Sequence, residues 1–125
     1  MDKLDKIFTM QQDLDSYMDR KRSFKSKYTP EEWVQKKSLA LIDEVGELLD
    51  EVNYKWWKNP KTLDKQAISE ELVDILHFWV SMCLDMGLTA EDIYKVYKKK
   101  NQDNKDRQTG KIIKDGYCCK NGNSN

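Results

Sequence analysis

The chain has 125 residues, a length that suits one domain with a modest hydrophobic core. Charged residues make up 35% of it, and 22 basic side chains balance 22 acidic ones. Net charge therefore predicts neither nucleic acid nor a membrane as a partner. In addition, no apolar run approaches the ~18 residues of a membrane span.

The three cysteines are Cys83, Cys118 and Cys119. They have neither the spacing of zinc ligands nor the pattern of a disulfide framework. The N-terminal sequence MDKLDKIF is not typical of a signal peptide. Together these observations favour a reduced, cytoplasmic location.

Helical periodicity runs through the chain, and no segment alternates as a strand does. We therefore predict an all-α fold, a compact bundle of four main helices. The first helix is expected over residues 2–20. The second begins at Pro30, which follows Thr29 as the cap and precedes Glu32 as the partner in a capping box, and it runs to about residue 54.

The third and fourth helices follow the breaking sequence KNPKT. Thr62 is the predicted cap of the third helix, which stops at Gly87. Thr89 begins the fourth, with Asp92 at the capping-box position, and this helix runs to about Arg107. We expect residues 1–110 to form the domain and residues 111–125 to form a polar, flexible tail, because the end of the chain is rich in Gly, Lys and Asn.

Acidic residues are concentrated in the second helix, where residues 43–51 hold five acids and no base. Glu44 and Glu47 are three residues apart, so they lie on one face of the helix, with Glu51 a further turn along. Ile42 and Val45 lie on roughly the opposite side. Taken alone, this helix is explained by a solvated acidic face.

The third helix favours a different interpretation, because apolar residues cover well over half of its circumference. Such a helix is expected to be largely buried in its domain or in a subunit interface. Its narrow polar stripe nevertheless carries Glu71 and Asp74, again three residues apart. Unpaired carboxylates are costly to bury, and a divalent cation would remove that cost. Four carboxylates from two neighbouring helices favour Mg²⁺ or Mn²⁺ over zinc.

The fourth helix is basic, and residues 95–114 hold eight bases and two acids. Asn101, Asn104 and Arg107 follow one another at three-residue spacing, with Lys100 beside them. Amide and guanidinium donors in this arrangement can bind phosphate oxygens. A lysine-rich helix end that complements the helix dipole explains the lysines equally well.

Four segments in this order resemble a known family: LALIDEVGELLDE, YKWW, EELVDILHF and KKNxxNxxRQ. They are similar to the dimeric, all-α dUTPases of bacteria, phages and trypanosomatids, within the wider group of MazG-type nucleotide pyrophosphohydrolases. The resemblance covers roughly residues 4–110. It implies hydrolysis of dUTP to dUMP and pyrophosphate by attack at the β-phosphorus, with dUDP as a second substrate.

The resemblance also implies roles for individual residues. Glu44, Glu47, Glu71 and Asp74 would ligate Mg²⁺, for which Mn²⁺ could substitute, and Glu44 would also activate the attacking water. The substrate-binding set implied by the resemblance is Gln12, Asp15, Trp57, His77, Phe78, Lys100, Asn101, Asn104 and Arg107. The first five would surround the base, and the last four would bind sugar and phosphate. Asp15 stands where the family usually has an asparagine, so discrimination of uracil from cytosine stays open.

A homodimer, with the third helix near the interface, is expected from the broad apolar faces of these short helices and agrees with the resemblance. Two other functions stay open. One is the same chemistry on another base, as in a pyrophosphohydrolase of dCTP or of several NTPs. The other is a non-catalytic helical interaction module. A regulatory protein partner is compatible with the enzyme and with the interaction module.

Overall fold

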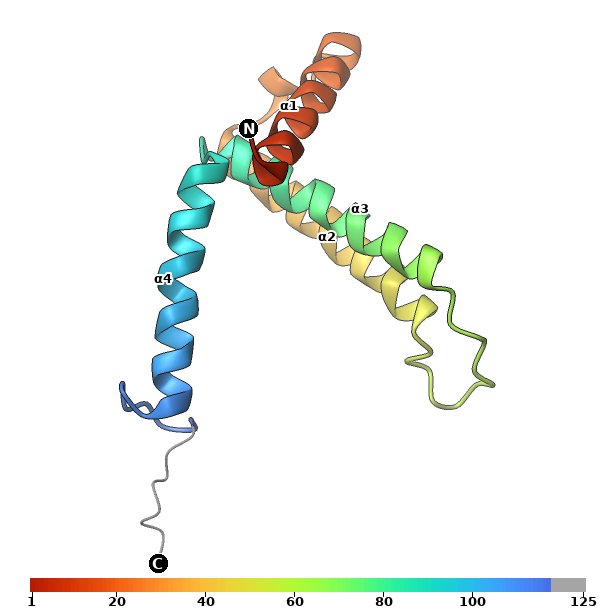
Figure 1. Ribbon diagram of the computed structural model, residues 1–125. Helices are drawn as coiled ribbons and strands as arrows, with labels where there is room; N and C mark the ends of the chain where they lie inside the picture. The colour runs from red at the N-terminus through yellow and green to blue at the C-terminus, as the bar shows by residue number, and fades with distance from the viewer. Residues whose placement is uncertain (118–125) are drawn as a thin grey trace, which may run out of the picture. The chain divides into compact units, whose positions relative to one another are not determined.

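Four α-helices make up most of the computed structural model, which describes residues 1–117 (Figure 1). No β-strand occurs within residues 1–117, so the predicted all-α class with four main helices is confirmed. Cys118, Cys119 and the end of the predicted tail lie outside the described residues. The elements are α1 (Lys3–Arg22), the short 3₁₀ helix η1 (Lys25–Lys27), α2 (Pro30–Glu51), α3 (Lys65–Asp85) and α4 (Ala90–Thr109).

The start of α2 has the capping box that its sequence predicts. The hydroxyl of Thr29 accepts a hydrogen bond from the backbone N–H of Glu32 at 3.1 Å. The carboxylate of Glu32 in turn accepts from the backbone N–H of Thr29 at 3.1 Å. Pro30 follows at the first helical position, where its missing N–H costs nothing. These interactions fix the direction in which α2 leaves the preceding loop.

The loop between α2 and α3 is longer at both ends than predicted. Helix α2 ends at Glu51, and Asn53 adopts a left-handed conformation with φ 57°. The side chain of Asn53 then accepts from the N–H of Lys61 and donates to its carbonyl oxygen, both at 2.9 Å. The predicted cap at Thr62 is wrong: Asp64 is the cap and accepts from two backbone N–H groups, because its carboxylate can serve both at once.

Helix α3 ends two residues before the predicted stop at Gly87. The backbone N–H of Leu88 donates to the carbonyl of Cys83 at 2.9 Å, and the N–H of Gly87 donates to that of Leu84 at 3.0 Å. This pair of bonds defines a Schellman motif. It requires a left-handed residue after the helix, and Gly87, with φ 73°, adopts that conformation without strain.

The described chain divides into two compact units, residues 1–89 and residues 90–117. In the first unit, α2 and α3 run side by side in opposite directions, and α1 packs against α3 (Figure 1). The second unit consists of α4 and the turn that follows it. The predicted domain boundary at residue 110 stays a prediction.

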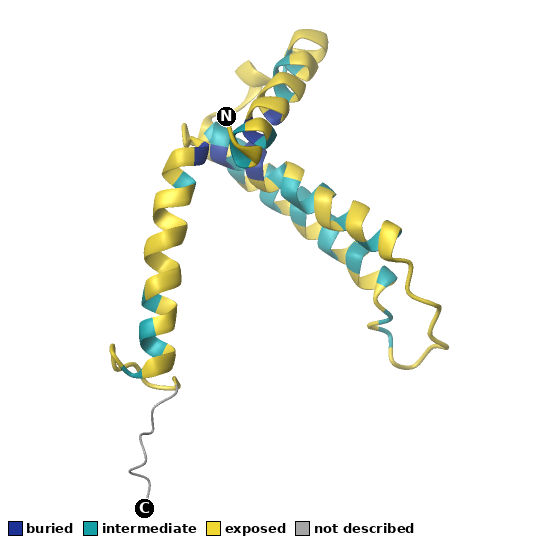
Figure 2. Cartoon of the chain, in the orientation of Figure 1, coloured by how far each residue is buried: buried dark blue, intermediate teal, exposed yellow. Residues whose placement is uncertain are grey.

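Buried side chains gather where α1 meets the C-terminal half of α3 (Figure 2). Phe8 of α1 packs edge-on against Trp79 of α3, and Val80 is fully buried. Elsewhere α3 is less buried than its composition suggests, since Leu72 is 51% exposed and Val73 49%. The expectation that α3 is largely buried is therefore wrong within this chain, and burial in a subunit interface stays a prediction.

Within residues 1–117, no single helix is long and apolar enough to cross a membrane. The consecutive helices α3 and α4 meet the criteria of length and composition only when they are taken together.

Candidate active site

The four carboxylates singled out in the sequence converge between α2 and α3. Each of Glu44, Glu47, Glu71 and Asp74 offers one oxygen, and these four oxygens all lie within 4.8 Å of one another. The convergence follows from the antiparallel packing, because each helix presents its two acids one turn apart on the face toward its neighbour. We call these four residues the acidic cluster.

Two oxygens of the acidic cluster are buried without a hydrogen-bond partner. They are Oε2 of Glu44 and Oε2 of Glu71, one from each helix. A buried carboxylate oxygen without a donor is costly, so the arrangement is unfavourable unless a positive group satisfies it. Glu47 is exposed and keeps the cluster open to solvent on one side.

Crowding and burial shift the protonation of these groups. The pKa of Glu44 rises from the usual 4.5 to about 7, first because burial disfavours its charged form. A hydrogen bond with Glu47 and the negative charges of Glu47, Asp74 and Glu71 add to the shift. The pKa of Glu71 is raised by the same kinds of cause, with burial again the largest. Burial and mutual repulsion therefore both favour the protonated forms of Glu44 and Glu71 when no cation is bound.

These observations meet the requirements of a divalent metal site. The cluster offers four hard oxygen ligands, leaves two buried oxygens unsatisfied and concentrates negative charge. Oxygen-only donor sets suit Mg²⁺ and Mn²⁺ better than zinc or copper. The acidic cluster could thus hold a metal ion.

A second group of polar side chains connects all three helices of the first unit. His77 Nδ1 lies 2.6 Å from Gln11 Oε1, and Gln11 Nε2 donates to Asp15 Oδ1 at 2.9 Å. Asp15 Oδ2 accepts from the Ser81 hydroxyl at 2.7 Å, and that hydroxyl accepts from Lys37 Nζ at 2.7 Å. Lys37 also forms an ion pair with Asp85 at 2.7 Å. We call this set the polar chain: His77, Gln11, Asp15, Ser81, Lys37 and Asp85.

Only part of the polar chain is among the residues predicted from the sequence. Asp15 and His77 belong to the predicted binding residues, but Gln12 rather than Gln11 was predicted with them. In the structure Gln11 is buried and bonded, whereas Gln12 is exposed. The available signal was spacing: Gln11 and Asp15 are four residues apart on α1. His77, Ser81 and Asp85 repeat that interval on α3, so each set shares one face.

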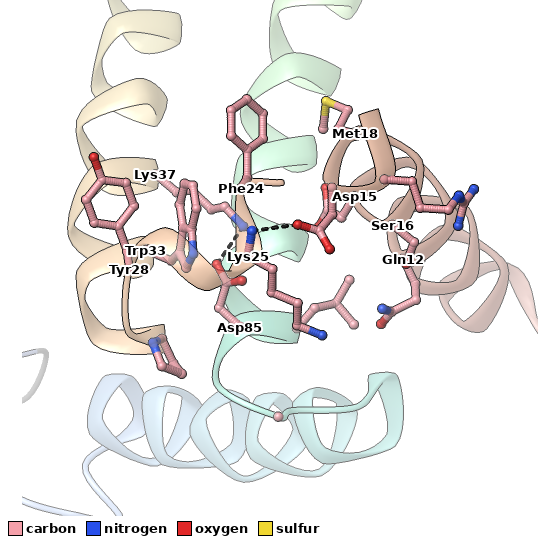
Figure 3. Close-up of a pocket in the computed structure, with 15 residues that line it drawn as sticks. Gln12, Asp15, Ser16, Met18, Phe24, Lys25, Tyr28, Trp33, Lys37 and Asp85 are labelled. Carbon is pink, nitrogen blue, oxygen red and sulfur yellow. Dashed lines mark hydrogen bonds and ion pairs between the residues drawn. The ribbon is translucent and has the colours of Figure 1, made fainter. Parts of the chain in front are cut away.

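A hollow of about 670 Å³ lies beside the Lys37 end of the polar chain (Figure 3). Lys37 and Asp85 line it together with Asp15 and Gln12. Its wall includes Trp33, whose ring contacts Tyr28 edge-on with centroids 5.0 Å apart. The polar chain is therefore open to this hollow at one end, and the exposed ring of His77 lies at its other end.

The aromatic residues predicted near the base lie in different elements. Trp57 is in the loop after α2, where its ring meets those of Trp56 and Tyr54 edge-on at 4.7 Å and 6.4 Å. Phe78 follows His77 on α3 and is partly buried. The structure joins Asp15 to His77 through Gln11, but it records no such link from Trp57 to either residue.

The predicted phosphate-binding residues all lie on α4, in the second unit. Arg107 donates to Asn104 Oδ1 at 3.3 Å and lies over the ring of Tyr117 at 5.9 Å. Lys100 and Asn101 are exposed. Their spacing on one helix is as predicted, and their role in binding substrate stays a prediction.

The first unit is thus an all-α structure with a four-carboxylate cluster between two antiparallel helices. The profile of one protein family, described as dUTPase, matches residues 3–89, which is most of the first unit and more than half of the chain. This protein belongs to the dUTPase family. The acidic cluster and all members of the polar chain fall inside the matched residues.

Two of the individual relatives are named for dCTP rather than dUTP. The chain is 31% identical over 100 residues to the dCTP pyrophosphatase of Enterobacteria phage T4, covering 61% of this chain and 58% of that protein. It is 35% identical over 74 residues to protein YpjD of Bacillus subtilis, covering 57% of this chain and 67% of YpjD. It is 40% identical over 45 residues to the dCTP pyrophosphatase of Enterobacteria phage LZ5, covering 36% of this chain and 26% of that protein. No solved structure matches the chain at a comparable level.

Proposed function

We propose that this protein is a Mg²⁺-dependent pyrophosphohydrolase that converts dUTP to dUMP and pyrophosphate, with dUDP as a second substrate. The observation that carries the proposal is the acidic cluster, in which four carboxylate oxygens lie within 4.8 Å of one another inside a dUTPase-family match. Such a reaction would limit uracil in DNA and supply dUMP.

Mg²⁺ bound by the acidic cluster would offset the charge of phosphate oxygens and lower the pKa of a bound water. Glu44 is the candidate to accept the proton of the attacking water. The water oxygen bonds to phosphorus as the anhydride P–O bond breaks, and the products are the monophosphate and pyrophosphate.

Residues outside the acidic cluster would hold the rest of the nucleotide. Lys100 and Arg107 supply cationic donors suited to phosphate oxygens, and Asn101 and Asn104 add amide donors. Trp57 and Phe78 offer aromatic faces on which a base can stack. His77 supplies a ring nitrogen for a hydrogen bond to the base.

The first test is a substrate panel. The protein is incubated with Mg²⁺ and each of dUTP, dCTP, dTTP, dATP, dGTP and UTP, and monophosphate and pyrophosphate are quantified. We expect dUTP to be preferred and EDTA to abolish turnover. Turnover of nucleotides with several different bases would agree with the metal site but contradict the preference for dUTP. Folded protein that hydrolyses none of them would favour the helical interaction module instead.

A second candidate substrate is dCTP, and two observations favour it. Two relatives are named dCTP pyrophosphatase. In addition, Asp15 stands where the resemblance implies an asparagine near the base, and this replacement changes the hydrogen-bond donors and acceptors around the base. In the same panel, dCTP turnover above that of dUTP would establish this alternative.

The proposed enzyme is a homodimer. Leu72 and Val73 on α3 and Leu39 and Ile42 on α2 are exposed within the chain, and such apolar surface is usually covered by a partner. Sedimentation equilibrium should then give about twice the chain mass of 14.8 kDa. A monomer at micromolar concentration would contradict this assignment without affecting the metal site.

A further inference from the structure

The polar chain has only one arrangement of its hydrogens that satisfies every contact. An ammonium group can only donate, so Lys37 Nζ donates to the Ser81 oxygen at 2.7 Å. The Ser81 hydroxyl hydrogen is then directed to Asp15 Oδ2, also at 2.7 Å. Asp15 is thereby held as an acceptor, with the positive charge of Lys37 one hydroxyl away.

The orientation of the Gln11 amide follows from that of Asp15. A carboxylate accepts hydrogen bonds and donates none, so the Gln11 atom that faces Asp15 Oδ1 at 2.9 Å must be the NH₂ group. The carbonyl oxygen of Gln11 therefore faces His77 Nδ1 at 2.6 Å. Gln11 is 6% exposed, so water has little access to compete for these contacts.

A carbonyl oxygen can only accept, and Nδ1 of His77 must therefore carry the hydrogen. The neutral ring then keeps its other nitrogen, Nε2, unprotonated. We infer that Lys37, Ser81, Asp15 and Gln11 act as positioning residues that hold His77 in the Nδ1–H tautomer, so that Nε2 presents a hydrogen-bond acceptor to the pyrimidine base. The contact with the base rests on the proposed function, whereas the tautomer does not.

Two further interactions hold Lys37 in place and so maintain the direction of hydrogen-bond donation along the polar chain. The side chains of Lys37 and Asp85 are 19% and 18% exposed, and their ion pair spans α2 and α3. The ammonium also lies over the Trp33 ring, 5.3 Å from its centroid. A partly buried, charge-paired ammonium is not easily displaced from Ser81.

Replacing Asp15 by asparagine should reverse the arrangement. The Ser81 hydrogen still needs an acceptor, so the carbonyl of the introduced amide would face Ser81 and its NH₂ group would face Gln11. The Gln11 amide would then rotate by half a turn and donate to His77 Nδ1. Asp15→Asn therefore converts Nε2 from an acceptor into a donor, without a change of side-chain size.

Nitrogen NMR tests the tautomer without any nucleotide, and His77 is the only histidine in the sequence, so its signals need no assignment. The full chain, labelled with ¹⁵N-histidine, is measured without metal at a pH where the ring is neutral. We expect Nδ1 to show the signal of a protonated nitrogen and Nε2 that of an unprotonated one, and we expect Asp15→Asn to interchange the two. A protonated Nε2 in the unsubstituted protein, or unchanged signals in a folded Asp15→Asn variant, would overturn the inference.

Two glutamine variants keep the test informative if Asp15→Asn does not fold. Gln11→Ala should lose the preference for Nδ1–H, because the acceptor opposite Nδ1 is gone. Gln12→Ala, one residue along the same helix, should keep it, because Gln12 is exposed. Equal effects of both substitutions on the nitrogen signals would contradict the role of Gln11.

Substrate preference tests the contact with the base. Uracil and cytosine have opposite donors and acceptors at N3 and at the exocyclic group on C4. The ratio of kcat/KM for dCTP to that for dUTP should therefore change at least about tenfold in Asp15→Asn. Gln35→Ala, an exposed glutamine on α2, serves as the activity control. An unchanged ratio in an active variant would overturn the contact, whereas absence of turnover in every form would refute the proposed function and leave the tautomer result standing.

Discussion

Substituting Glu71 by glutamine should abolish nucleotide hydrolysis while the fold survives. The amide keeps the size of the side chain but removes one negative charge and one strong metal ligand from the acidic cluster. Loss of a metal ligand at a centre that stabilises phosphate charge should lower kcat at least about a hundredfold. Metal-free Glu71→Gln should be at least as stable as the unsubstituted protein, because Glu71 Oε2 is buried without a partner and its pKa is raised by burial and neighbouring acids.

Glu70→Gln is the matched control, since it makes the same change one residue away. Glu70 is exposed and accepts a hydrogen bond from Gln66 at 3.2 Å, outside the acidic cluster. Activity is measured with dUTP and with dCTP, and unfolding is followed by circular dichroism with and without Mg²⁺. Retained turnover in Glu71→Gln, or an equal loss in Glu70→Gln, would refute the assignment of Glu71 as a metal ligand.

Local sequence signals predicted the helices because each signal acts within one or two turns. The capping box at Thr29 and the left-handed Gly87 depend on neighbours a few residues away. Thr29 was identified correctly as the cap of α2, and Gly87 was identified as the end of α3, whose last helical residue lies two residues earlier. Thr62 failed as a cap because a competing residue, Asp64, offers a carboxylate that accepts from two backbone groups. Residues 52–64 are fixed by side-chain bonds from Asn53 that periodicity does not reveal.

The acidic cluster was easier to predict than the polar chain for a physical reason. Glu44 and Glu47, like Glu71 and Asp74, are pairs one turn apart, so antiparallel packing of two helices suffices to bring them together. The polar chain also includes residues of α1, and it forms only when α1 has one particular rotation about its own axis. Gln11 and Gln12 differ by about 100° around that axis, and only packing against His77 selects Gln11. Charge segregation likewise singled out α4 but could not specify its contacts.

The raised pKa of Glu44 predicts an unusual pH dependence of stability in metal-free protein. In the unfolded chain Glu44 titrates near 4.5, and in the folded protein near 7. Its contribution to stability is therefore fully present below pH 4.5 and is lost as the pH rises to about 7, because the folded state binds the proton more tightly than the unfolded state does. Glu71, whose pKa is also raised, acts in the same direction.

Thermal unfolding in EDTA at a series of pH values between about 4.5 and 8 measures this effect, with Glu44→Gln as the reference because glutamine does not titrate. The melting temperature of the unsubstituted protein relative to that variant should fall as the pH rises through this window. Mg²⁺ should reverse the trend, since the metal competes with the proton for the same oxygens and stabilises the folded state more at about pH 8 than at about pH 5. If the difference in melting temperature between the unsubstituted protein and Glu44→Gln is independent of pH, the pKa of Glu44 is not raised by the acidic cluster. If Mg²⁺ stabilises both proteins equally at both pH values, the ion is bound elsewhere.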